Sequence, residues 1–168
     1  MTNNDLLRRV RYIFDFNDAK MIAIFALADN KVTREQVSSW LKKEEDPDYQ
    51  TLSDMQLAIF LNGLINDKRG KKDGPQHKLE SPLTNNLIFM KLKIALNLKA
   101  EDVLEIMSLT EFRMSKHELS AFFRKADHKH YRECKDQILR NFLKGLQLSY
   151  RNEGKRNDAK STSVYKGK

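Results

Sequence analysis

The most chemically suggestive stretch of the sequence places two histidines and the single cysteine within eight residues. It runs from Asp127 to Cys134, and its His128, His130 and Cys134 are side chains of the kinds that ligate zinc, with His117 as a remote fourth candidate. Their spacing matches no established zinc pattern. No orienting acid or oxyanion donor supports Cys134 and His130 as a nucleophilic pair. We therefore interpret Cys134 as a small buried residue and expect no metal, no other cofactor and no enzymatic activity.

Two other stretches match ligand-binding loops only in part. Residues 63–72 contain glycines and lysines, but the separation of the glycines is wrong for a phosphate loop, and Lys72 stands where a hydroxyl residue is needed. Residues 44–48 are acidic, but they lack the spacing and the central glycine of a calcium-binding EF-hand. We interpret the acidic run as the solvated end of a helix.

Basic side chains recur in a pattern that could contact phosphates. They follow i, i+4, i+8 spacing on the second helix of two predicted helix-turn-helix-like pairs, whose turns fall at residues 29–32 and 111–114. The alternative is that these are the ordinary solvated faces of amphipathic helices. The candidate nucleic-acid contacts are Arg34, Ser38 and Lys42 in the first half, Lys116, Ser120 and Arg124 in the second, and Lys71 and Lys72 between them.

These patterns belong to a chain that repeats itself. Phe60-Leu61-Asn62-Gly63-Leu64 returns as Phe142-Leu143-Lys144-Gly145-Leu146, and the same offset of 82 residues aligns Asn3-Asn4 with Asn85-Asn86. The alignment between these points needs no gap. The sequence therefore predicts a tandem duplication.

Each half predicts four helices. In the first half, the first helix covers about residues 4–15 and the second begins near residue 18. The third helix covers about residues 33–44, and the fourth begins near residue 53. Each is predicted because apolar residues recur at helical spacing. Thr33 to Gln36 and Ser115 to Glu118 both have the pattern of a capping box at the start of the third helix. On the fifth helix the pattern places Lys91 and Lys93 outside.

Gly63 and Gly145 fall late in the fourth helix of each half. Glycine there costs about 1 kcal/mol of helix propensity relative to alanine, and a close crossing by another helix would compensate. We place the contact between the repeats at these glycines. A fraying helix end is the alternative.

The predicted fold is all-α: two four-helix units related by a pseudo-twofold axis and packed as one compact helical domain. Neither half alone is sure to bury enough apolar surface, so both should unfold together in calorimetry, and separate transitions would contradict this. The predicted segments are a first repeat at 1–66, a basic linker at 67–84, a second repeat at 85–148 and a disordered basic tail at 149–168.

Composition limits the classes of protein that the chain can belong to. A chain with 40% apolar and 32% charged residues is typical of soluble globular proteins, and no apolar run approaches a membrane span. One cysteine favours a reducing compartment, so we expect a cytoplasmic protein. The net charge is +8, and residues 148–168 carry six basic and two acidic side chains. Half of the basic excess therefore lies in the predicted tail.

Several motifs occur together in the sequence: Asn3-Asn4-Asp5, Trp40-Leu41-Lys42-Lys43-Glu44, Phe60 to Ile65 with Lys68-Arg69-Gly70, and Asp127-His128-Lys129 with Arg132-Glu133-Cys134. Together they resemble the YehS-like family, a group of bacterial cytoplasmic proteins of unknown function built from two related helical halves. The resemblance covers about residues 3–146 and implies the same fold and compartment, but it implies no activity, cofactor or catalytic residue.

The sequence leads to two functional hypotheses. The first is a non-enzymatic binding module that associates with DNA or RNA through the basic stripes. The second is a protein-interaction adaptor that uses an apolar groove between the two halves. Salt separates them, because phosphate binding weakens steeply as salt rises and apolar binding does not. The oligomeric state is left open, since an internal duplication already supplies the symmetry of a homodimer.

Overall fold

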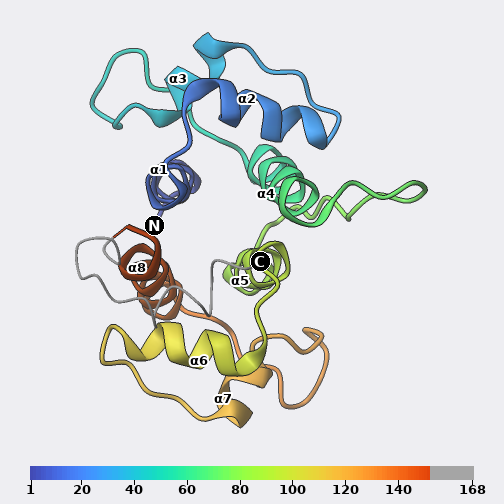
Figure 1. The fold of residues 1–168 in the computed structure, drawn as a ribbon, viewed down its shortest axis with the longest axis vertical. Coiled ribbons are helices and arrows are strands. Elements are labelled where there is room, and N and C mark those ends of the chain that lie inside the picture. Colours follow the sequence, from blue (N-terminus) through green and yellow to red (C-terminus); the bar gives the residue numbers. More distant parts are fainter. Residues whose placement is uncertain (152–168) are drawn as a thin grey trace. The chain divides into compact units, whose positions relative to one another are not determined.

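The computed structural model describes residues 1–151, and within this range the chain forms eight helices and no strand (Figure 1). The expected all-α class is confirmed. Two compact units divide the chain: Met1–Leu83 contains the first four helices, and the second unit begins at Thr84. The helices are α1 (Asn3–Phe14), α2 (Asp18–Leu27), α3 (Arg34–Leu41), α4 (Asp54–Arg69), α5 (Asn85–Ala95), α6 (Ala100–Ser108), α7 (Lys116–Ala121) and α8 (Asp136–Arg151).

The backbone repeats as closely as the sequence does. Asp15 and Asn97, which are 82 residues apart, both have φ of 54°, and Asp29 and Glu111 both have φ of 59°. The capping boxes predicted at Thr33 and Ser115 are both present. In each box the hydroxyl accepts from the third helical N–H and the long side chain accepts from the capping residue's own N–H, so two otherwise unpaired donors are satisfied.

In the first unit α2 packs against α3 and α4, and α1 packs against the same two helices. In Figure 1 α1 and α4 are seen nearly end-on, with α2 running across them. The core is aromatic: the Phe25 ring lies 5.4 Å from the Trp40 ring and 5.2 Å from the Phe60 ring, measured between centroids. These rings join α2, α3 and α4, so one cluster of side chains holds three helices in place.

The second unit repeats this arrangement with different side chains. Here α6 packs against α7 and α8, and α5 packs against α8. Phe89 of α5 is the central ring, 4.6 Å from Phe142 and 5.0 Å from Phe123 between centroids. Phe89 and Phe142 are fully buried and lie in the apolar core of the unit.

The two late glycines are explained within each repeat. A Cβ atom on Gly63 would lie 2.0 Å from the Ile24 carbonyl oxygen of α2, and one on Gly145 would lie 2.4 Å from the Ile106 carbonyl oxygen of α6. The expected close crossing is therefore present, but assigning it to a contact between the repeats was wrong. The helix that crosses each glycine is the second helix of the same unit.

The third helix ends earlier than its sequence predicts. α3 stops at Leu41, and Lys42 is extended, with φ −72° and ψ 158°. The reason lies in α1, because the Trp40 carbonyl accepts from Asn4 Nδ2 and the Lys42 carbonyl accepts from Arg8 Nη1. Side chains from α1 thus bind the carbonyls that another helical turn would use. Likewise α7 ends at Ala121, three residues before Arg124.

The fourth helix of each unit extends beyond its predicted repeat. α4 continues through residues 67–69, which were expected in the linker, and Asp67 forms an ion pair of 2.6 Å with Lys20 of α2. α8 continues through residues 149–151, and Ser149 is buried, so these residues do not belong to a disordered tail. The rest of that predicted tail, residues 152–168, lies outside the described residues.

One predicted surface residue is buried. Lys91 on α5 is 4% exposed, although its place in the helical pattern assigned it to solvent. The amino group of Lys93 lies 5.5 Å from the centre of the Phe123 ring.

Within residues 1–151, every helix is too short or too polar to cross a membrane.

Candidate functional site

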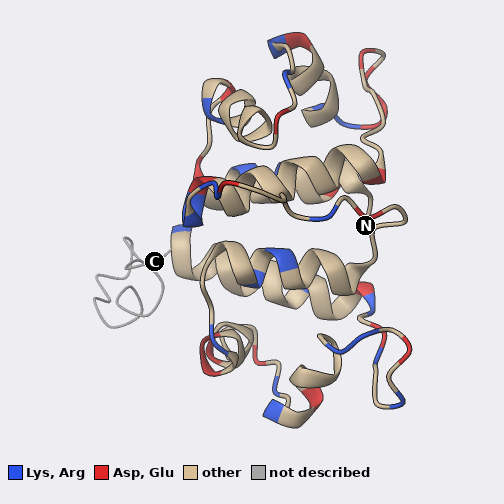
Figure 2. Cartoon of the chain, turned by 90° about the vertical axis from the view of Figure 1, so that its right-hand side faces the viewer, with Lys and Arg blue, Asp and Glu red and all other residues tan. Residues whose placement is uncertain are grey.

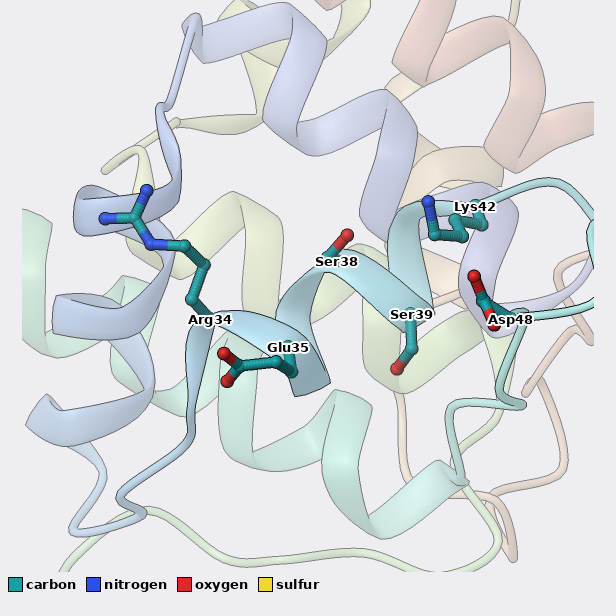
Figure 3. Close-up of a pocket in the computed structure, with 6 residues that line it drawn as sticks. All are labelled: Arg34, Glu35, Ser38, Ser39, Lys42 and Asp48. Carbon is teal, nitrogen blue, oxygen red and sulfur yellow. The ribbon is translucent and has the colours of Figure 1, made fainter.

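The predicted stripe of the first repeat lines one surface cavity. Arg34, Ser38 and Lys42 surround it together with Glu35, Ser39 and Asp48, and its volume is about 530 Å³. Figure 3 shows Arg34 and Lys42 at opposite ends of α3, with Ser38 between them. The three predicted contacts therefore share a surface, although Lys42 reaches it from the extended segment after the helix.

The charges around this cavity are mixed. Two cationic and two acidic side chains line it, and Arg34 lies 4.0 Å from Asp18 of α2. Both partners of that pair are largely exposed, at 68% and 42%, so the pair contributes little to stability. Figure 2 shows the same mixture elsewhere, with basic and acidic residues interspersed along the helices and loops of each unit. A continuous basic stripe is therefore absent from this face.

The equivalent cation of the second repeat is also paired. Lys116 Nζ donates to Glu101 Oε1 over 2.7 Å, and this bond is the main reason that the pKa of the Glu101 carboxyl is lowered. Ser120 Oγ donates to the His117 carbonyl, so its hydroxyl proton is engaged within the helix. Arg124 lies beyond the end of α7. The predicted stripe of the second repeat is thus not a single helical face.

A different basic feature is present in both repeats. Each third helix is followed by two adjacent cations, Lys42-Lys43 in the first unit and Arg124-Lys125 in the second, and we call these the cation doublets. Among residues 1–151, no carboxylate lies within ion-pair distance of any of the four side chains. The doublet cations are therefore available to an external anion, and they recur at equivalent positions of the two repeats.

The two linker lysines differ in their partners. Lys71 Nζ donates to Asp29 Oδ1 of the turn between α2 and α3 over 2.6 Å, so it is tied to the first unit. Lys72 is exposed, and its carbonyl accepts from Gln76. Only Lys72 of this pair keeps a side chain without a carboxylate partner within the described part of the chain.

The structure separates the zinc candidates. His128 and His130 lie in an exposed loop, where His128 Nδ1 accepts from the His130 N–H over 3.0 Å. Cys134 is 2% exposed, and its N–H donates to Asn86 Oδ1. Within residues 1–151, no three His, Cys, Asp or Glu side chains are placed to hold a metal ion.

The burial of Cys134 leads to a prediction about its reactivity. Burial raises the pKa of its thiol to about 12, so the protonated form persists throughout the neutral range in the folded protein. We expect iodoacetamide at pH 8 to label native Cys134 at least about tenfold more slowly than the urea-unfolded chain. Mass spectrometry of timed samples would measure this, and equal rates in the two states would contradict the burial.

Sequence reasoning missed two features of the site region. One is a network in which Asn3, Asn4, Asn85 and Asn86 hold the loops that carry the doublets, although these residues already marked the start of the repeat. The other is an apolar pocket of about 290 Å³ in the second unit, between α5 and the segment after α7. A position-by-position comparison of the two halves would have indicated this pocket, because apolar residues of the second half replace charged residues of the first.

Comparison with known proteins identifies relatives but no activity. Residues 3–70 and residues 85–152 each match the domain described as a protein of unknown function, DUF1456. The chain is 45% identical over 147 residues to the uncharacterized protein YehS of Escherichia coli (strain K12). The aligned region covers 87% of this chain and 94% of the relative. No solved structure matches the chain. The predicted tandem duplication and YehS-like resemblance are confirmed.

Proposed function

We propose that this chain, which belongs to the YehS-like DUF1456 family of proteins of unknown function, is a cytoplasmic, non-enzymatic module that binds nucleic acid. The observation that carries the proposal is the recurrence of an unpaired cation doublet at the same place in both repeats. Two such doublets in one chain can contact two stretches of a phosphate backbone, as two subunits of a dimer do.

The doublets are better placed for phosphate contact than the full stripes. Arg34 and Lys116 begin their helices beside the carboxylates of Asp18 and Glu101, which compete with any phosphate. None of the four doublet cations has a carboxylate within ion-pair distance among residues 1–151, although Glu35 and Asp48 line the same cavity as Lys42. Ser38 lines the same cavity as Lys42, so its hydroxyl group is also near the first doublet, whereas the hydroxyl of Ser39 donates to the Gln36 carbonyl.

The geometry favours contact with the backbone over reading of base edges. A helix-turn-helix protein contacts base edges with the N-terminal residues of its recognition helix, whereas both doublets follow the C-terminal ends of α3 and α7. Contacts to phosphates position a protein without conveying sequence information. The proposal is therefore binding with little sequence preference.

A charge-matched pair of variants tests this function in the full chain. The doublet variant replaces Lys42, Lys43, Arg124 and Lys125 by glutamine. The control replaces Lys155, Arg156, Lys160 and Lys166, so it loses the same four positive charges outside the described region. Fluorescence anisotropy with labelled duplex DNA and with single-stranded RNA would be recorded from about 50 to 200 mM salt.

We expect the doublet variant to bind at least about tenfold more weakly than wild type at low salt and to show a shallower salt dependence. The control should retain most of the affinity. Equal losses of affinity in the two variants would show that net charge, and not the doublets, determines binding. Absence of binding by the wild-type chain at low salt would contradict the proposal of nucleic-acid binding. Circular dichroism of both variants would establish that they remain folded.

A further inference from the structure

The second unit contains an apolar pocket with a basic rim. Its floor and walls include Leu87 and Met90 of α5, Phe123, Ala126 and Tyr131, and its volume is about 290 Å³. The Phe123 ring is held in place from behind by Phe89, with which it makes an edge-on contact at 5.0 Å. A pocket of this size is near the lower limit of cavities that take small organic ligands.

The first repeat carries charged residues where the second has this apolar lining. Asp5, Arg8 and Glu44 stand at the positions of Leu87, Met90 and Ala126. In the first unit Arg8 is paired with Asp5, and its Nη1 also donates to the Lys42 carbonyl over 2.8 Å. The second unit has no counterpart of this side-chain bridge, because leucine and methionine have neither the charge nor the donor.

The exchange between the repeats leaves a more positive surface. The second repeat lacks the two carboxylates and the Arg8 cation of this region but keeps the two cations of the doublet, since Lys42 and Lys43 correspond to Arg124 and Lys125. Arg124 and Lys125 both line the pocket, and no carboxylate within residues 1–151 lies within ion-pair distance of either. The second unit thus combines an apolar interior with two uncompensated positive charges at its edge.

From this combination we infer that the pocket binds a small carboxylate with an apolar body, such as a medium-chain fatty acid. The hydrocarbon would contact Leu87, Met90 and Phe123, where burial removes apolar surface from water. The carboxylate would lie at the rim, where Arg124 offers paired N–H donors and Lys125 offers a point charge. The first unit, with Asp5, Arg8 and Glu44 at these positions, would not bind it.

This inference does not rest on the nucleic-acid proposal, although Arg124 and Lys125 serve in both. A variant that changes the floor and leaves the cations in place separates the two. Leu87→Asp combined with Met90→Arg transplants the Asp5–Arg8 pair of the first repeat into the second. It should fill the pocket with a side-chain bridge that the same backbone already accommodates in the first unit, and it removes no basic residue.

The experiment titrates the full chain with octanoate, octan-1-ol and acetate while recording methyl NMR spectra of Leu87 and Met90. We expect saturable shifts with octanoate, with a Kd of about 1 mM or below, and at least about tenfold weaker binding of the other two. Arg124→Gln with Lys125→Gln should reduce octanoate affinity to that of octan-1-ol. The transplant should remove binding, followed through the remaining methyl signals of the pocket, and leave nucleic-acid affinity unchanged.

A second variant keeps the test decisive if the transplant does not fold. Ala126 is exposed, and Ala126→Glu restores the carboxylate of Glu44 beside the two cations without changing the floor. It should weaken octanoate at least about fivefold and leave octan-1-ol unaffected. Absence of saturable shifts in the wild-type chain would overturn the inference. Equal affinity for octanoate and octan-1-ol would overturn the assignment of an anionic ligand.

Discussion

Replacing Gly63 or Gly145 by alanine is expected to destabilise the protein by about 3 kcal/mol, although the same change stabilises an ordinary helix by about 1 kcal/mol. The added Cβ would lie 2.0 Å from the Ile24 carbonyl oxygen or 2.4 Å from the Ile106 carbonyl oxygen. Both distances are far inside van der Waals contact. The obstacle is helix backbone and not a flexible side chain, so the two crossing helices must separate and lose packing along their length.

Urea unfolding followed by circular dichroism would measure this loss for each variant. Lys144→Ala is the matched control, because Lys144 is exposed and precedes Gly145 on the same helix. It changes helix propensity without adding an atom to the interface, and we expect an effect within about 0.5 kcal/mol. An alanine at either glycine that left stability unchanged or increased it would show that the helices do not cross as closely as the structure has them.

Local signals in the sequence account for most of the helices. The capping patterns at Thr33 and Ser115 and the proline at position 47 act within a few residues, so a reader of the sequence can use them directly. The duplication helps further, because each element is observed twice. Apolar spacing seen in both halves is less easily a coincidence than spacing seen once.

Features that depend on distant residues could not be predicted in this way. Asp46-Pro47 sets a latest end for the third helix, but its actual end at Leu41 follows from side chains on α1. Gly63 indicates a close neighbour without saying which helix supplies it. Helical periodicity places Lys91 outside because it describes one helix and not the surroundings, which bury that residue.

The candidate site shows the same limit. Spacing placed Lys42 and Arg124 on helical stripes, whereas the helices end before them and leave them in the doublets. The pairing of Lys116 with Glu101 joins residues of α6 and α7 that no periodic pattern connects. The apolar pocket differs, because the exchange of Arg8 for Met90 between the halves is visible in the sequence alone.

Removal of the Asn4 or Asn86 side chain should lower the free energy of unfolding by about as much as alanine at Gly63 or Gly145 does. Asn86 Nδ2 donates to the Phe122 and Arg132 carbonyls over 2.9 and 2.8 Å, and its Oδ1 accepts from the Cys134 N–H over 2.9 Å. Asn4 makes the same three bonds in the first repeat. One side chain therefore fixes both ends of the loop that follows the third helix.

Alanine at either position leaves two carbonyls and one N–H without their partner in a buried setting. Each such group costs about 1–3 kcal/mol, and partial access of water to the loop reduces the total, so we expect a loss of about 3 kcal/mol in urea unfolding. Limited proteolysis should cut the freed loop first. Because Asn86, Phe122 and Tyr131 line the pocket, Asn86→Ala should also weaken octanoate binding, whereas Asn4→Ala should not.

Aspartate at position 86 distinguishes loss of hydrogen bonds from loss of volume. It fills the same space and can still accept from the Cys134 N–H, but its second oxygen would face the two carbonyls that Asn86 now binds as a donor. The variant should therefore be at least as unstable as Asn86→Ala at pH 7. It should regain stability as the pH falls, because a protonated carboxyl supplies one donor. Asn141, whose bonded partner Gln137 is exposed, serves as the control, and Asn141→Ala should have little effect. If Asn86→Asp were as stable as wild type at pH 7, the two carbonyls would not need their donor, and the loop would be held by packing alone.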